Sequence, residues 1–167
     1  SWEIKTGHGD TEIKKSLAYD VESDRIIMVH NGISAYAYDY NTDTWTIIMS
    51  TNDDNGKALA YDVESDRIIQ VGHYYETYAY DFNANTWEML NSNPSGSASK
   101  TLAYNIENDR IILVDDAGSL TWAYDYNNDI WEQRADHSFS GDGDDKSLAY
   151  IGDIELPSHS GPTWHIS

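Results

Sequence analysis

"LAYDVESDRII" occupies residues 17–27 and returns unchanged at residues 59–69. A third version, "LAYNIENDRII", occupies residues 102–112, and a fourth "LAY" begins at Leu148. Successive copies begin 42, 43 and 46 residues apart. A nearly constant period of this size indicates a repeat architecture, in which similar small units pack against one another.

Each unit contains four short segments of β-strand character. In the first unit they read "KSLAYD", "RIIMV", "AYAYDY" and "TWTIIM", separated by "VESD", a variable loop and "NTD". The segments are rich in Tyr, Trp, Ile and Val, and the turns in Asn and Asp, whereas helical periodicity is absent. The sequence therefore predicts an all-β protein of four-stranded antiparallel sheets. Four strands in about 42 residues are typical of a β-propeller blade.

The ends of the chain predict how the propeller closes. We expect one domain over residues 1–167, with blades at about 15–50, 57–92, 100–135 and 146–167. The last unit has room for only three strands, whereas "SWEIKT" at residues 1–6 matches the fourth strands "TWTIIM" and "TWEML". Residues 1–6 are therefore expected to complete the last blade. Four blades can close within one chain, the alternative we favour, or two chains can exchange end strands in one eight-bladed ring.

Two known propeller types resemble these units. "SDRIIMV" followed by "YAYDYNTDTW", and "SDRIIQVGH" followed by "YAYDFNANTW", resemble kelch-type blades, although His30-Asn31, Gly72-His73 and Asp115-Asp116 stand where kelch units carry a glycine doublet. This resemblance implies a protein-interaction or scaffold module. The four-bladed closure resembles hemopexin-like propellers, which carry ions along the axis. That resemblance allows Ca²⁺ or another cation on the axis, near the strand ends at Asp20, Asp62 and Asn105.

Composition excludes several classes of function. The formal net charge is −19, with 10 Lys and Arg against 29 Asp and Glu, and a field of this sign repels nucleic acid and anionic membranes. No apolar run approaches the roughly 20 residues that span a bilayer, so no membrane insertion is expected. Without cysteine there is no disulfide, thiolate zinc site or thiol nucleophile. The chain starts at Ser1, and we expect either a processed secreted protein or a trimmed chain.

Seven of the ten cationic residues occupy repeat-equivalent positions. Arg25, Arg67 and Arg110 each follow an aspartate, so pairing with Asp24, Asp66 and Asp109 or the turn glutamates is expected. Four lysines each stand two residues before an "LAY" leucine: Lys15, Lys57, Lys100 and Lys146. A ring of ammonium groups around one mouth of the propeller would attract an anionic ligand.

The loops that share this mouth differ between units and carry the candidate ligand-binding residues. They are His30, Asn31, His73, Tyr74, Tyr75, Asp115 and Asp116. Exposed aromatic rings beside Asn, Asp and His suit sugars, whose CH faces stack while their hydroxyls take directed hydrogen bonds. A metal site of the histidines and aspartates is an alternative use of the same loops.

No catalytic signature is present: the sequence has no HExxH, no G-x-S-x-G and no phosphate loop. Near-identical units around an axis suit a binder better than an enzyme, whose catalytic residues are normally asymmetric. The sequence thus predicts a secreted, non-enzymatic, lectin-like propeller for carbohydrates, with acidic sugars or other small anions as preferred ligands. The alternatives are a kelch-type protein-interaction module and an ion-carrying, hemopexin-like protein.

Overall fold

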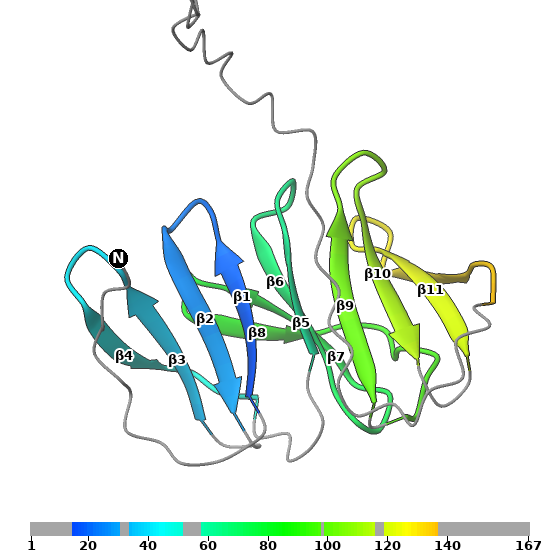
Figure 1. The fold of residues 1–167 in the computed structure, drawn as a ribbon, viewed down its shortest axis with the longest axis horizontal. Coiled ribbons are helices and arrows are strands. Elements are labelled where there is room, and N and C mark those ends of the chain that lie inside the picture. Colours follow the sequence, from blue (N-terminus) through cyan, green and yellow to red (C-terminus); the bar gives the residue numbers. More distant parts are fainter. Residues whose placement is uncertain (1–14, 31–33, 52–57, 98, 116–118, 137–167) are drawn as a thin grey trace, which may run out of the picture.

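Three four-stranded antiparallel sheets form the described part of the protein (Figure 1). The structure is a computed structural model that describes residues 15–30, 34–51, 58–97, 99–115 and 119–136. Within these ranges there are twelve strands and no helix, and each sheet takes its strands in chain order. We refer to the sheets as blades 1, 2 and 3.

The blades have matching strand boundaries. Blade 1 contains β1 (Lys15–Asp20), β2 (Arg25–His30), β3 (Ser34–Asp39) and β4 (Thr44–Ile48). Blade 2 contains β5 (Ala58–Asp62), β6 (Arg67–Val71), β7 (Thr77–Asp81) and β8 (Thr86–Met89). Blade 3 contains β9 (Lys100–Asn105), β10 (Arg110–Asp115), β11 (Leu120–Asp125) and β12 (Ile130–Gln133).

The predicted strands and turns of the first three units are confirmed. Each "LAY" lies on the first strand of its sheet, each "RII" on the second, and the two pair antiparallel, with Leu59 opposite Gln70 and Tyr61 opposite Ile68 in blade 2. The fourth predicted unit at residues 146–167 and the closing strand at residues 1–6 lie outside the described residues. The described sheets therefore establish three blades, and the four-bladed ring remains a prediction.

The turns between first and second strands and between third and fourth strands are stabilised by one repeated hydrogen bond. Each of these turns ends on an Asp or Asn in the left-handed region, with φ between 50° and 55°, at Asp24, Asp43, Asp66, Asn85, Asp109 and Asp129. The side chain of each accepts a hydrogen bond from the tyrosine five residues earlier, for example Tyr61 to Asp66 at 2.9 Å and Tyr80 to Asn85 at 2.9 Å. Asp and Asn tolerate this backbone conformation better than most residues. Burial, together with the Asp66 carboxylate, raises the pKa of Tyr61.

The repeated arginines do not pair with the aspartates that precede them, so this prediction is wrong. Their guanidinium groups instead contact the carboxylates that end the third strand of the same blade, Arg25 to Asp39 at 2.8 Å, Arg67 to Asp81 at 2.9 Å and Arg110 to Asp125 at 2.7 Å. The preceding aspartates offer the arginines only their backbone carbonyls. Their side chains face the tyrosine hydroxyls, because the turn is left-handed at that residue.

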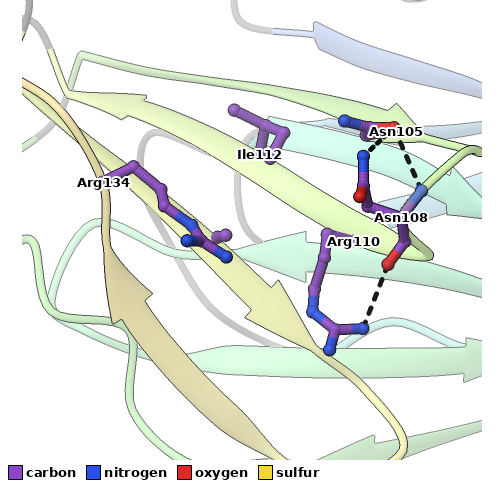
Figure 2. Close-up of a pocket in the computed structure, with 6 residues that line it drawn as sticks. Asn105, Asn108, Arg110, Ile112 and Arg134 are labelled. Carbon is purple, nitrogen blue, oxygen red and sulfur yellow. Dashed lines mark hydrogen bonds between the residues drawn. The ribbon is translucent and has the colours of Figure 1, made fainter.

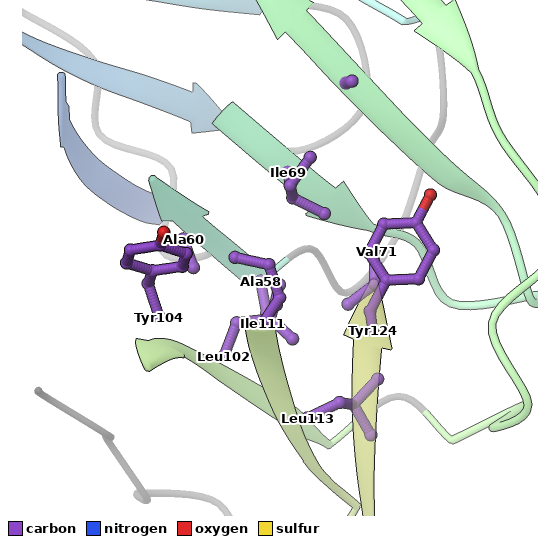
Figure 3. Packing of buried hydrophobic residues seen from close by; sticks show 10 residues of the cluster. Ala58, Ala60, Ile69, Val71, Leu102, Tyr104, Ile111, Leu113 and Tyr124 are labelled. Atoms are coloured by element: carbon purple, nitrogen blue, oxygen red, sulfur yellow. The ribbon is translucent and has the colours of Figure 1, made fainter. Parts of the chain in front are cut away.

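The core lies between successive blades, and the "LAY" strands contribute to both of its clusters. Leu59 and Tyr61 of β5 join one buried cluster with Ile27 and Val29 of blade 1. Leu102 and Tyr104 of β9 join the second cluster, which includes Ile69 and Val71 of blade 2 (Figure 3). Because side chains alternate along a strand, the alanines of β5, Ala58 and Ala60, belong to the cluster on the other side. β5 is thus buried on both faces, with Leu59 and Tyr61 toward blade 1 and Ala58 and Ala60 toward blade 3.

The chain between blades also makes hydrogen bonds to the next blade. The indole N–H of Trp87 donates to the carbonyl of Met49 at 2.8 Å, and the N–H of Met49 donates to the Asn85 side chain at 3.0 Å. One blade further on, Asn91 bonds Asp129 through its backbone N–H at 3.0 Å and its side-chain amide at 2.8 Å. These contacts fix the outer edges of consecutive blades relative to each other.

The turn hydrogen bonds yield a stability prediction. Asp109→Ala removes the acceptor of the Tyr104 hydroxyl (2.9 Å) and of the Asn127 amide (2.9 Å), and it leaves alanine at a φ of 50°. We expect a loss of about 2–3 kcal/mol in the free energy of unfolding, measured by urea denaturation. Asp109→Asn is the matched control, because Asn85 fills the equivalent place in another turn, and it should lose less than half as much. Equal losses for the two variants would contradict this account.

Candidate functional site

The loop between β6 and β7 presents the largest aromatic surface among the predicted ligand-binding residues. Tyr74 and Tyr75 are 63% and 50% exposed. The His73 ring meets Tyr74 edge-on, with 4.3 Å between the ring centroids. The structure therefore brings these three predicted residues together on one loop of blade 2, and we call residues 73–75 the aromatic platform.

A buried asparagine holds the platform in place. The N–H of Asn93 donates to the Tyr75 carbonyl at 2.7 Å, and its side-chain amide donates to the Glu76 carbonyl at 2.9 Å. The base of the loop is closed by the N–H of Gly72, which donates to the same Glu76 carbonyl at 2.8 Å. Asn93 is 1% exposed, so its hydrogen bonds are protected from competing water. The exposed rings thus stand on a loop whose backbone is fixed from behind.

Tyr75 carries a backbone conformation that is rare for its residue type. Its φ is 83°, in the region that glycine normally occupies. A Cβ added at Gly96 would lie 2.6 Å from the Tyr75 hydroxyl oxygen, so the absence of a side chain at Gly96 leaves space for that ring. Sequence reasoning missed both Asn93 and Gly96, which lie in "NSNPSGS", a stretch that resembles an ordinary polar connection.

The lysines predicted at the mouth differ in environment. Lys100 is 9% exposed, and its ammonium group donates to the Gly72 carbonyl at 2.6 Å, below the aromatic platform. Lys15 is exposed and lies opposite His30 in the β1–β2 pairing. Lys57 and Lys146 lie outside the described residues. A complete ring of four cations therefore stays a prediction, and the structure places one lysine in a supporting position.

The remaining predicted loop residues are buried or lie outside the described ranges. Asp115 is buried, pairs with Lys100 in the strand register, and accepts a hydrogen bond from the Ser95 hydroxyl. His30 is buried at the end of β2. Asn31 and Asp116 are among the residues that are not described. Lys100, Ser95 and Asp115 thus form a polar support between the aromatic platform and the start of blade 3.

The predicted axial residues cap the turns at the opposite end of the first strands. Asp20 accepts from the N–H of Ser23 at 3.0 Å, Asp62 from that of Ser65 at 3.1 Å, and Asn105 from that of Glu107 at 3.1 Å. Such Asx turns account for Asp and Asn at these places without a ligand. Among the described residues, no group of three or more His, Cys, Asp or Glu side chains is arranged to hold a metal ion. An axial cation stays a prediction.

Asp62 yields a pH-dependent prediction. Burial raises the pKa of Asp62, so the folded protein binds this proton more tightly than the unfolded chain. The contribution of Asp62 to the free energy of unfolding is fully present below its unfolded pKa of about 3.9. It is lost as the pH rises through the folded pKa. Asp62→Asn keeps the turn acceptor, as Asn105 does in blade 3, and removes the buried charge.

We therefore expect Asp62→Asn to melt at a higher temperature than the unmodified protein at pH 7. The difference should vanish near pH 3, where the carboxyl group is protonated in both states. Differential scanning calorimetry at the two pH values measures this difference. An advantage that persists unchanged at pH 3 would show that charge burial is not its cause.

A second surface feature is a hollow of about 320 Å³ on blade 3 (Figure 2). Six residues line it: Asn105, Asn108, Arg110, Ile112, Ala123 and Arg134. Figure 2 shows Arg110, Ile112 and Arg134 around the opening. None of the predicted ligand-binding loop residues lines this hollow.

Comparison with known proteins supports the fold. No protein-family profile matches the chain, and no curated protein does. An auxiliary nutrient binding protein from Bacteroides thetaiotaomicron is similar in structure, with a TM-score of 0.53 and 11% identity over 69% of this chain and 29% of that one. A catalytically inactive virginiamycin B lyase from Staphylococcus aureus, in complex with quinupristin, has a TM-score of 0.57 and 8% identity over 74% of this chain and 41% of that one.

These neighbours are β-propeller-like proteins, so the described sheets are an all-β, propeller-like assembly. The chain spans less than half the length of either neighbour. The kelch type that the sequence resembles is not confirmed. Within the described part of the chain, no helix is long and apolar enough to cross a membrane.

Proposed function

We propose that this protein is a secreted, non-enzymatic, carbohydrate-binding propeller whose ligand stacks on the aromatic platform, residues 73–75. The observation that carries the proposal is a pair of tyrosines, 63% and 50% exposed, on a loop that buried Asn93 holds from behind. Two neighbouring exposed aromatic residues offer apolar surface that a ligand can cover. A loop that is already ordered loses little conformational entropy when the ligand binds.

The chemistry of the platform fits a sugar. Tyrosine faces pack against the CH groups of a pyranose ring, and the phenol hydroxyls and the His73 imidazole offer hydrogen bonds to its hydroxyls. No cofactor is needed for such binding. The auxiliary nutrient binding protein among the structural neighbours is consistent with a binding role for a propeller of this kind. Repetition of near-identical units also favours binding over catalysis.

A preference for acidic sugars would depend on the exposed lysine. Lys15 stands at the same end of its blade as the platform does in blade 2, since both lie where the second strand ends. Its charge would attract a uronate or sulfate against the overall negative field. Lys15→Ala should then weaken binding of acidic sugars and leave binding of neutral sugars unchanged.

A glycan array tests the proposal, and Tyr74→Ala is the decisive variant. We expect selective binding by the unmodified protein and at least a tenfold weaker Kd for Tyr74→Ala, measured by calorimetry with the best array ligand. Tyr40→Ala is the matched control, because Tyr40 is 58% exposed in the turn at the opposite end of β3. Both variants should stay folded, since neither ring is buried.

The array also separates the alternative functions. A blank array, or equal loss of binding in Tyr74→Ala and Tyr40→Ala, would overturn the carbohydrate proposal and favour a protein-interaction module. Arrays run with calcium and with chelator test the ion-carrying alternative. Binding that chelator abolishes would mean that a cation takes part in the site.

A further inference from the structure

Among the described residues, blades 1 and 3 each have one face that no other blade covers, and the two faces match. Leu17 and Tyr19 of β1 are 56% and 51% exposed. Their repeat equivalents, Leu59 and Tyr61 of β5 and Leu102 and Tyr104 of β9, are 4–8% exposed, because each pair is covered by the preceding blade. We call Leu17 and Tyr19 the blade-1 ridge.

The matching surface on blade 3 is partly exposed. In blade 1, Ile27, Val29 and Ala37 receive the ridge of blade 2 and are fully buried. Their equivalents in blade 3 are Ile112, Val114 and Ala123, which we call the blade-3 seat. Ile112 and Val114 are only half-buried, and the hollow of about 320 Å³ opens over Ile112 and Ala123. The hollow is therefore the place that a ridge fills elsewhere in the molecule.

The two internal interfaces show what a ridge does in its seat. Tyr61 and Tyr104 lie in these interfaces with their hydroxyls bonded to the turns of their own blades, to Asp66 and Asp109, each at 2.9 Å. Tyr19 makes the same bond to Asp24 at 2.8 Å, so its side chain is already held as its buried equivalents are. An incoming ridge would therefore present the same shape to an apolar seat.

The charges around the hollow permit the same pairing. Where the blade-1 and blade-2 seats carry Ile48 and Leu90, blade 3 carries Arg134. Arg110 and Arg134 line the hollow and are paired with Asp125 at 2.7 Å and Glu132 at 2.9 Å, so their charges are balanced. Asn105 also replaces the aspartate that stands near the ridge tyrosine in the other interfaces, which lowers repulsion in a chain of net charge −19.

We propose that the blade-1 ridge of one chain docks on the blade-3 seat of a second copy, and that two copies joined reciprocally form one closed ring. The pattern "RII" followed by "AYA" or "WAY" occurs three times in the sequence, at blades 1, 2 and 3. Blades 2 and 3 fill the first two seats, and no described blade fills the third. A contact between unlike faces closes into a ring when its rotation allows.

The test is the mass of the 167-residue chain in solution, measured by light scattering and sedimentation at micromolar concentration. We expect the unmodified protein to be a dimer. Leu17→Asp should weaken dimerisation at least about 100-fold while the chain stays folded, because it places a charge in the interface but on a residue that is exposed in the monomer. Leu59→Asp, the same change at the buried equivalent, should unfold the chain and serves as the control.

A mixing experiment tests the head-to-tail geometry. Ile112→Asp, with Val114→Asp as a second seat variant, should also be monomeric. Leu17→Asp chains keep an intact seat and Ile112→Asp chains keep an intact ridge, so an equimolar mixture should recover a dimer that neither forms alone. No recovery from folded variants would overturn the proposal.

Two further outcomes would also overturn it. One is an unmodified protein that stays monomeric, with Ile112→Asp lowering the melting temperature, which would mean that another part of the same chain, such as "SLAY" at residues 147–150, covers the seat. The other is a dimer that Leu17→Asp leaves as tight as before.

Discussion

A four-stranded sheet with apolar side chains on both faces cannot bury them alone, and this constraint organises the whole protein. The first strand of each unit alternates large and small residues, so Leu59 and Tyr61 enter the preceding blade while Ala58 and Ala60 give the following blade room to approach. The interface between blades, rather than the interior of any one blade, is the hydrophobic core. Folding of one unit therefore depends on its neighbours.

Polar groups in the turns complement this core. A tyrosine hydroxyl, a left-handed Asp and an asparagine from the neighbouring turn form a small network at one end of each described blade. At the other end the turns diverge, and blade 2 uses that freedom to display Tyr74 and Tyr75 above Asn93. Blade 2 thus has one end stabilised by the repeated turn hydrogen bonds and another end that displays side chains to a ligand.

The fold was largely predictable because the repeated residues are the ones that form the strands and turns. "LAY", "ESD" and "RII" mark strand, turn and strand wherever they occur, and the period of about 42 residues sets the blade. The partners of Arg25, Arg67 and Arg110 were not predictable, since they depend on a left-handed turn that points the preceding carboxylate elsewhere. The site was predicted in part: Tyr74 and Tyr75 were identifiable as exposed aromatics. The burial of Lys100 and the support by Asn93 come from contacts between distant segments, which spacing does not encode.

Near-identity of the interfaces has a consequence for how the chain assembles. A ridge that fits one seat fits any other, so the apolar contacts do not distinguish the correct order of blades from a swapped one. The order must come from the connections: Met49 bonds Trp87 and Asn85, and Asn91 bonds Asp129, only when consecutive blades are neighbours. In a refolding chain these few polar contacts therefore stabilise the native order of blades relative to misassembled intermediates. Such misassembly is the characteristic failure of repeat proteins.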